Sequence, residues 1–327
     1  MNSKTKLNKT AGWITWEIQV RNRSMSSALG VPLFEVLSKK SKLLKYPELI
    51  FKTINIIAEN KIKILFVQNP SIVLSFLAVC LKPIFGLTVI VDAHNSGIFP
   101  LEGRSKILSF FARIICKTSN YTIVSNHFLA ETVAAWDGNP IVVPDPIPNL
   151  AAHRGNPQPV SIPYILFICT WAADEPYHEI IKAAQLLKNG ISIYMTGKYQ
   201  GKLTSSEILA LPQNIKLLGF VSESDYINYF EHATGVIDLT TRDNCLVCGA
   251  YEATELGIPA ILSNSFVNKN IFSQGFVFTE NNATAISESI EILINRNIEL
   301  RKSIRDFKDI YMTHHATQMR ALQNILE

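Results

Sequence analysis

The residues best suited to chemistry lie in the segment 239–263, which reads LTTRDNCLVCGAYEATELGIPAILS. The pattern predicts a strand end, a polar loop over 240–245, a helix starting near Cys248, and a second strand opened by Pro259. A helix that starts at the carboxyl end of a parallel strand offers free backbone N–H groups and the positive end of its dipole. The segment therefore predicts an anion site, with the carboxylate of Glu252 close to it.

The side chains of this segment are those that a sugar nucleotide needs. A guanidinium such as that of Arg242 matches a diphosphate, and the amides at the helix start supply further donors. Glu252, about one turn into the helix, can accept hydrogen bonds from sugar hydroxyls. A charged loop that is simply solvated is the other interpretation. The predicted donor-binding residues of this segment are Arg242, Asp243, Asn244, Cys248, Gly249 and Glu252.

Two more residues outside the segment are candidates for the donor site. Lys198 follows a predicted strand and can approach a phosphate, and Trp171 either stacks on a ring or packs in the core. The pair Cys245 and Cys248 has the CxxC spacing, but zinc takes four ligands and no second cysteine pair or histidine cluster accompanies it. We interpret both cysteines as small packing residues and predict no metal site.

A second polar group follows the predicted strand 88–91, where the chain reads VIVDAHNSGIFPLE. Polar residues at the carboxyl end of a strand point toward the ligand in open α/β sheets. Asp92 or His94 can act as general base on an acceptor hydroxyl, or His94 can hydrogen-bond the transferred sugar. The alternative is a cap-and-turn cluster in which Asp92 or Asn95 satisfies backbone groups. We predict Asp92 and His94 as catalytic residues and Asn95 on the acceptor side.

Arg21 and Arg23 lead from the first predicted strand into a predicted helix. They either recognise an anionic acceptor, such as a lipid-linked pyrophosphate, or are plain surface charge, and the sequence favours neither. The turn lacks the GxGxxG pattern, so it does not carry the nicotinamide or flavin fingerprint.

Short apolar runs alternate with amphipathic segments along the whole chain, which predicts βα units and parallel sheets. The segment 145–162 is rich in Pro, Asn and Gly and is typical of a linker. We therefore expect two doubly wound, Rossmann-like domains facing a cleft, over 1–150 and 151–312, with the helix over 313–327 packed back on the first. The predicted strands are 12–16, 32–36, 64–67, 88–91, 122–124, 141–143, 164–169, 191–195, 215–218, 236–239, 259–262 and 276–278.

Composition limits the class of protein. The 327 residues are 47% hydrophobic, which favours a globular chain over a disordered one. Residues 1–150 hold 17 Lys and Arg against 9 Asp and Glu, and the rest holds 14 against 18. The basic half favours contact with an anionic membrane surface, or is simply a solvated surface. Five scattered cysteines, no signal peptide, and a longest apolar stretch broken by Lys82-Pro83 favour a cytoplasmic protein, at most peripheral at the membrane.

The segments 214–226 (NIKLLGFVSESDY) and 239–263 resemble the GT-B glycosyltransferases, and within them the retaining, family 4-like group that builds bacterial surface polysaccharides. That family has a Glu, seven residues and a second Glu at this helix start. Glu252 matches the second, which in the family binds the nucleotide ribose; the first falls at 244, which is Asn here, next to Asp243. His94 resembles the family's histidine that contacts the transferred sugar.

The chain departs from the family in two places. It reads TWAADEP where the family has an Arg and a Lys for the diphosphate, a role that falls to Arg242 or Lys198 here. It also reads WEIQVRNR in place of a glycine-rich turn. No DxD motif is present, in keeping with GT-B enzymes, in which a helix dipole and basic side chains stabilise the leaving diphosphate.

The resemblance implies a metal-independent hexosyltransferase that needs no cofactor. We expect no nucleic acid among its partners. Its substrates would be a nucleotide-sugar donor and a glycan or polyprenyl-diphosphate-linked acceptor of capsule, O-antigen or exopolysaccharide synthesis. Two alternatives remain open: a sugar-nucleotide epimerase of GT-B architecture, and a catalytically silent GT-B subunit that positions a partner transferase.

Overall fold

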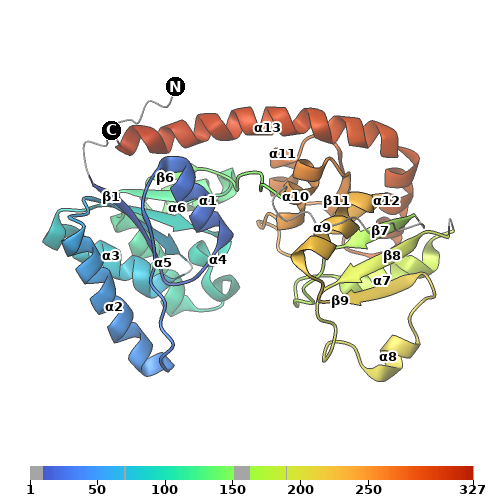
Figure 1. Cartoon of the computed structure of the whole chain (residues 1–327), viewed down its shortest axis with the longest axis horizontal. Helices are drawn as coiled ribbons and strands as arrows, with labels where there is room; N and C mark the ends of the chain where they lie inside the picture. The colour runs from blue at the N-terminus through green and yellow to red at the C-terminus, as the bar shows by residue number, and fades with distance from the viewer. Residues whose placement is uncertain (1–9, 70, 151–162, 189, 327) are drawn as a thin grey trace. The chain divides into compact units, whose positions relative to one another are not determined.

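The computed structural model describes residues 10–69, 71–150, 163–188 and 190–326. The chain divides into two compact units, one of residues 1–146 with 313–327 and the other of residues 147–312. In each unit strands and helices alternate along the chain (Figure 1). The predicted linker 145–162 lies outside the described residues over 151–162.

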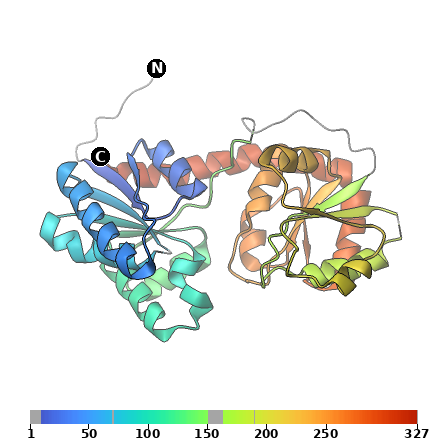
Figure 2. The same ribbon diagram turned by 60° about the horizontal axis from the view of Figure 1, so that its bottom comes forward.

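Unit 1 contains one six-stranded, wholly parallel sheet in the order β2-β1-β3-β4-β5-β6. Its central strands are buried along their length because helices cover both faces (Figure 2). This burial explains why they read as continuous apolar runs. The strands are β1 (Ala11–Thr15), β2 (Leu33–Glu35), β3 (Ile64–Asn69), β4 (Thr88–Ala93), β5 (Tyr121–Val124) and β6 (Pro140–Val142).

The helices of unit 1 begin and end at residues suited to those positions. Ser105 and Asn126 accept hydrogen bonds from the first turns of α5 and α6, while Gly30 and Gly86 end α1 and α3 in the left-handed region. The segment after β4 forms two short helical turns. The helices are α1 (Val20–Leu29), α2 (Lys42–Glu59), α3 (Ile72–Phe85), α4 (Asn95–Ile98), η1 (Pro100–Gly103), α5 (Lys106–Thr118) and α6 (His127–Ala135).

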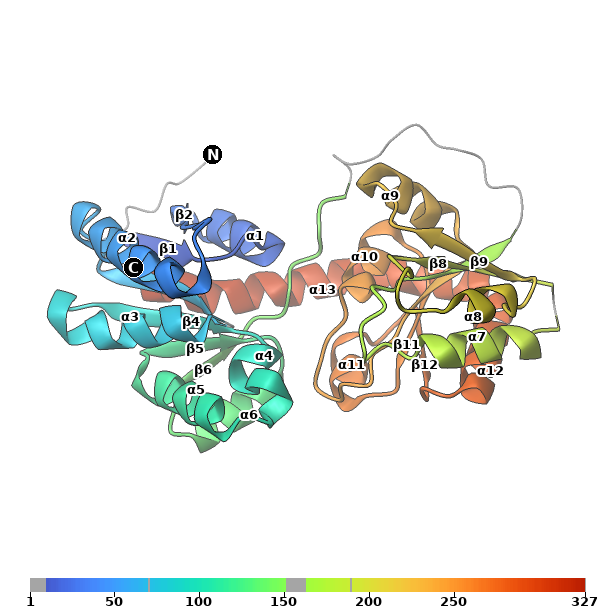
Figure 3. The same ribbon diagram turned by 90° about the horizontal axis from the view of Figure 1, so that it is seen from below.

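Unit 2 contains a second six-stranded parallel sheet, in the order β12-β11-β10-β7-β8-β9 (Figure 3). The strands are β7 (Tyr164–Phe167), β8 (Ser192–Thr196), β9 (Ile215–Gly219), β10 (Gly235–Asp238), β11 (Ala260–Ser263) and β12 (Phe276–Thr279). The helices are α7 (Tyr177–Leu186), α8 (Ser205–Leu209), α9 (Glu223–His232), α10 (Cys248–Leu256), α11 (Phe266–Ile271) and α12 (Ala283–Asn295). The predicted class, two doubly wound parallel sheets, is confirmed.

The last helix, α13 (Asn297–Leu326), contributes to both units. Its first half packs in the core of unit 2 through Ile304 and Phe307. Its last turns pack in the core of unit 1, where Met319 and Leu322 belong to the same cluster as Trp13. Unit 1 is therefore built from two segments that lie far apart in the chain.

Each sheet reverses its strand order at one place. In unit 1 the chain leaves β1 toward β2 and returns on the other side to β3, and in unit 2 it leaves β7 toward β8 and returns to β10. Loops that follow the two strands at such a switch point diverge, and ligands of open α/β sheets bind there. A ligand is therefore expected at the carboxyl ends of β1, β3 and β4 in unit 1, and at those of β7 and β10 in unit 2.

Candidate functional site

The start of α10 is packed tightly against the end of β10. The backbone N–H of Gly249 donates to the Asp238 carboxylate over 2.8 Å, and a Cβ at Gly249 would come within 2.5 Å of that carboxylate. Asp238 is buried, and burial raises its pKa well above the usual value, although the Gly249 bond opposes the rise. The first amide predicted for a phosphate is therefore already bound to a carboxylate of the chain.

Glu252 lies half-buried in the second turn of α10, facing α9. The hydroxyl of Tyr226 donates to one of its carboxylate oxygens. Burial raises the pKa of Glu252, and the hydrogen bond from Tyr226 works in the opposite direction. Tyr226 thus holds one oxygen of the carboxylate in place.

The loop after β10 is tied to the loop after β7. The Arg242 guanidinium lies 3.3 Å from a carboxylate oxygen of Asp174, and the Thr240 hydroxyl donates to the other oxygen over 2.9 Å. Arg242 is 42% exposed, so it can still reach a ligand. Its neighbours Asp243, which is exposed, and Asn244, which is half-buried, lie on the same loop.

Glu175 closes the loop after β7. Its carboxylate accepts hydrogen bonds from the backbone N–H groups of Thr170 and Ala172 and from the Thr170 hydroxyl, at 2.8–3.1 Å. The thiol of Cys169 lies 3.4 Å away. This segment, TWAADEP, therefore folds around a negative charge of its own.

The structure corrects the interpretation of Trp171 as a donor-stacking residue. Its side chain is 1% exposed, packs against Tyr177 and donates from Nε1 to the Thr196 carbonyl over 2.9 Å. It belongs to the hydrophobic core of unit 2. Lys198 is exposed at the end of β8, one strand away from the switch point.

The cysteine pair is split between two environments. Cys245 is half-buried, and burial raises the pKa of its thiol, whereas Cys248 is exposed at the first position of α10. The packing role predicted for Cys248 is therefore wrong. Neither thiol forms a disulfide. Over residues 10–69, 71–150, 163–188 and 190–326, no group of three or more metal-ligating side chains is found.

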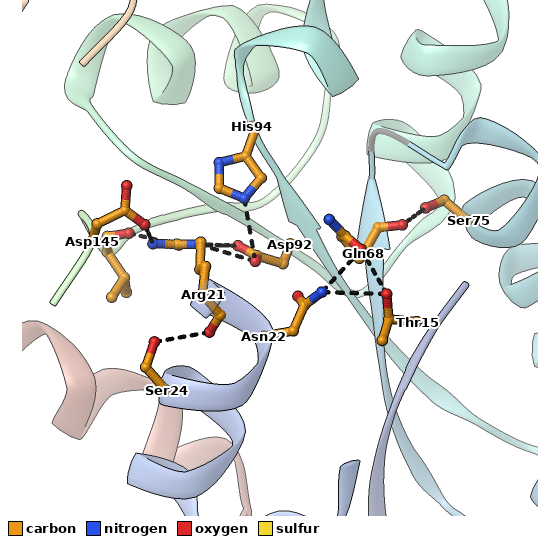
Figure 4. Close-up of polar contacts among 10 residues, drawn as sticks. Thr15, Arg21, Asn22, Ser24, Gln68, Ser75, Asp92, His94 and Asp145 are labelled. Atoms are coloured by element: carbon orange, nitrogen blue, oxygen red, sulfur yellow. Dashed lines mark hydrogen bonds and ion pairs between the residues drawn. The ribbon is translucent and has the colours of Figure 1, made fainter. Parts of the chain in front are cut away.

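At the switch point of unit 1, three side chains lie in a row across β1, β3 and β4. Gln68 and Asp92 are register partners, and the Thr15 hydroxyl donates to Gln68 Oε1 over 2.6 Å. Helix α1 places Arg21 over Asp92 and Asn22 over Thr15 and Gln68, as Figure 4 shows. The row is buried, so every polar atom in it needs a partner.

Arg21 is the centre of a buried ion cluster. It donates to both oxygens of Asp92 at 3.0–3.2 Å, to Asp145 at 2.6 Å, and to the Val143 carbonyl at 2.9 Å. Burial lowers the pKa of Arg21, but the two carboxylates outweigh it and the net shift is upward. Burial raises the pKa of Asp145, and Arg21 reverses this to a net lowering. Arg21 is therefore a buried residue with internal partners, whereas the sequence left open contact with an anionic acceptor and plain surface charge.

The two candidate bases, Asp92 and His94, have different surroundings in this cluster. Both oxygens of Asp92 are bound by Arg21 and the residue is 1% exposed, which favours a structural role for it. His94 follows β4 directly, is 27% exposed, and holds its Nε2 atom 3.9 Å from Asp92. Of the two side chains, that of His94 is the more exposed. Arg23 is exposed and pairs with Glu35 at 2.8 Å.

Several buried polar atoms of this region have no hydrogen-bond partner within the described part of the chain. Two of them, Asn22 Oδ1 and Gln68 Nε2, are the outward atoms of the amides that bind Thr15. Sequence reasoning did not single out Asn22 or Gln68; a polar residue at the end of an apolar strand was the available signal for Gln68. The full set is Asn22 Oδ1, Gln68 Nε2, Asn69 Oδ1, His94 Nε2 and Asn95 Oδ1.

Comparison with known protein families finds a match in the second half of the chain. Residues 151–308 match the family model described as glycosyl transferases group 1. No curated protein sequence matches the chain.

Solved structures of the same fold cover nearly the whole chain. Sucrose-phosphate synthase from Thermosynechococcus elongatus superposes with a TM-score of 0.75 at 13% identity, over 98% of this chain and 99% of that one. HepE from Anabaena in complex with UDP-glucose gives 0.73 at 12% identity, over 95% and 91%. The lipopolysaccharide outer core galactosyltransferase WaaB gives 0.65 at 12%, over 96% and 99%. The fold is therefore GT-B. No helix within the described residues has the length and apolar character needed to cross a membrane.

Proposed function

We propose that this chain, which has a GT-B fold and matches the group 1 glycosyl transferases over residues 151–308, transfers a hexose from a nucleotide sugar to a glycan or lipid-linked acceptor. The proposal extends to surface polysaccharide synthesis, to retention of configuration and to a cytoplasmic enzyme that contacts the inner face of the membrane. Unit 2 would hold the donor, and unit 1 would hold the acceptor and supply His94.

The observation that carries the proposal is the setting of Glu252. It lies within the segment that matches the glycosyl transferase family, on the helix that follows β10 at the switch point of unit 2. Tyr226 orients it, and burial keeps water from competing strongly for it. A carboxylate held in this way binds the two hydroxyls of a ribose more tightly than an exposed one does.

The neighbouring groups support the diphosphate and the chemistry. Arg242 is exposed on the loop after β10 and can exchange part of its contact with Asp174 for a phosphate oxygen. His94 is the half-buried imidazole that follows β4, and it can hydrogen-bond the transferred sugar or accept a proton from the acceptor hydroxyl. No cofactor is part of the proposed reaction.

The test compares two glutamates of one helix. Glu252→Ala is expected to weaken the binding of a nucleotide sugar by at least tenfold, because a hydrogen bond to a charged group contributes about 1.5–3 kcal/mol. Glu255→Ala is the matched control, since Glu255 lies three residues on and pairs with Lys308 at 2.8 Å. Binding is measured by calorimetry and thermal shift with UDP, GDP and CDP sugars. Equal affinities for the two variants, or no stabilisation by any donor, would contradict the proposal.

A second function is favoured by one specific observation. Three carboxylates, those of Asp174, Glu175 and Asp238, occupy the groups that a diphosphate would use. A GT-B subunit that has lost donor binding and positions a partner transferase would tolerate this arrangement. Its signature is glycan synthesis that does not change in cells carrying Glu252→Ala, together with a folded variant protein.

A further inference from the structure

The loop after β7 forms a small anion receptor. The backbone N–H groups of Thr170 and Ala172 and the Thr170 hydroxyl converge on one point, where they bind the Glu175 carboxylate at 2.8–3.1 Å. Successive N–H groups that point inward from a turn bind anions well, and their hydrogen bonds to a charged group are strong. The receptor is thus suited to a negative charge, and the Glu175 carboxylate of the same chain occupies it.

The receptor lies where a ligand of this sheet is expected. It follows β7, whose neighbour β10 lies across the switch point of unit 2. Asp174, the residue before Glu175, ties the receptor to the loop after β10 through Thr240 and Arg242. A diphosphate that enters this place meets a negative charge on Glu175 before it meets the donors behind it.

The Glu175 carboxylate can be displaced from the donors that bind it. Its side chain is half-buried, and Thr170, which supplies two of the donors, is exposed to solvent. Within the described part of the chain, the donors to this carboxylate are two N–H groups, a hydroxyl and a thiol, and none of them is positively charged. A phosphate, with more charge and more acceptor oxygens, can replace it at the same donors.

We propose that Glu175 is an affinity-determining residue that competes with the donor's diphosphate for the N–H groups of Thr170 and Ala172. This inference rests on the proposed function. Donor binding is an exchange in which the Glu175 carboxylate moves into solvent and a phosphate oxygen takes its place. The wild-type protein therefore binds nucleoside diphosphates weakly, and the repulsion from Glu175 also favours release of the diphosphate after transfer.

The experiment measures the dissociation constants of UDP and of inorganic pyrophosphate by calorimetry. Glu175→Gln keeps an acceptor oxygen for the loop and removes the charge, and we expect it to bind both ligands at least tenfold more tightly than the wild type. Glu175→Ala removes the competitor entirely and is expected to change affinity in the same direction. Uridine, which has no phosphate, should bind the variants and the wild type alike.

The matched control is Glu179→Gln. Glu179 lies one turn further on, in α7, and its carboxylate also accepts from a backbone N–H, that of Ala283, over 3.0 Å. It is expected to bind UDP as the wild type does.

Two results would overturn the inference, and they are distinguishable. If UDP binds the wild type and both Glu175 variants with affinities within twofold, Glu175 only stabilises the loop by its hydrogen bonds, and the proposed function stands. If neither UDP, GDP nor CDP binds any of these proteins while they remain folded, the donor function fails together with the inference.

Discussion

Removing the positive charge of Arg21 should destabilise unit 1 strongly. Arg21→Met keeps most of the side-chain volume but deletes every hydrogen bond of the guanidinium, including those to Asp92 and Asp145. Asp92 is 1% exposed, so its charge would stay buried without compensation. Breaking a buried ion pair in this way costs about 3–5 kcal/mol. Since a domain is stable by only about 5–15 kcal/mol, unit 1 would lose a large part of its stability.

Fluorescence can follow unit 1 alone. Three of the four tryptophans, Trp13, Trp16 and Trp136, lie in unit 1, and Trp171 lies in unit 2. Urea unfolding in a Trp171→Phe background therefore reports the first unit without a two-state assumption for the whole chain. The expected result is a lower urea midpoint with an unchanged slope.

The control and the refuting outcome come from the same region. Arg23→Met removes a second arginine that pairs with a glutamate, but this pair is exposed, so no measurable change is expected. Adding Asp92→Asn to Arg21→Met should restore part of the lost stability, because the uncompensated charge is gone. The reasoning fails if the Arg21 and Arg23 variants unfold at the same urea concentration, or if the second substitution restores nothing.

Two further predictions concern unit 2. Burial raises the pKa of Asp238 above its ordinary value of 3.8, so the folded state binds a proton that the unfolded state has lost. Stability should therefore fall as pH rises above 3.8, and Asp238→Asn should flatten the melting temperature between pH 4 and 8; equal slopes would contradict this. Gly197 has φ +84°, and a Cβ there would lie 2.0 Å from the Cys169 carbonyl oxygen, so Gly197→Ala should destabilise unit 2 by on the order of 2–3 kcal/mol. Gly201→Ala is the control, because Gly201 has a similar φ and open space where the Cβ would lie. An equal loss of stability in the two variants would show that the backbone angle alone is responsible.

Periodicity and turn chemistry were enough to predict the regular elements. The predicted strand over 236–239 and helix over 248–256 lie within one residue of β10 and α10. Both are short elements bounded by clear signals, such as Gly257 at φ +67° after α10. The helical turns over 95–103 were missed because they are set by contacts far along the chain. Gly97 lies so close to Asn69 that a Cβ would approach its carbonyl oxygen to 2.7 Å.

The site was harder to predict because side-chain pairing is not local. Arg21 meets Asp92 and Asp145 across 71 and 124 residues of sequence, so its charge looked available for a ligand. Glu175 is the opposite case: its partners lie three to five residues away, but their geometry depends on the turn itself. Glu252 could be singled out because the resemblance and the helix pattern pointed to the same residue.

The divided construction of unit 1 affects how the chain acquires its structure during synthesis. Trp13 and Phe66 stack in a core cluster that also contains Met319 and Leu322, which are translated some 250 residues later. Unit 2 consists of residues 147–312 alone, so all of its residues have been synthesised before the last segment of unit 1, residues 313–327. Although domains generally fold from the N-terminus onward, here the second unit can be finished before the first. Until the last turns of α13 are synthesised, the apolar residues of the first sheet that Met319 and Leu322 cover stay without this part of their core.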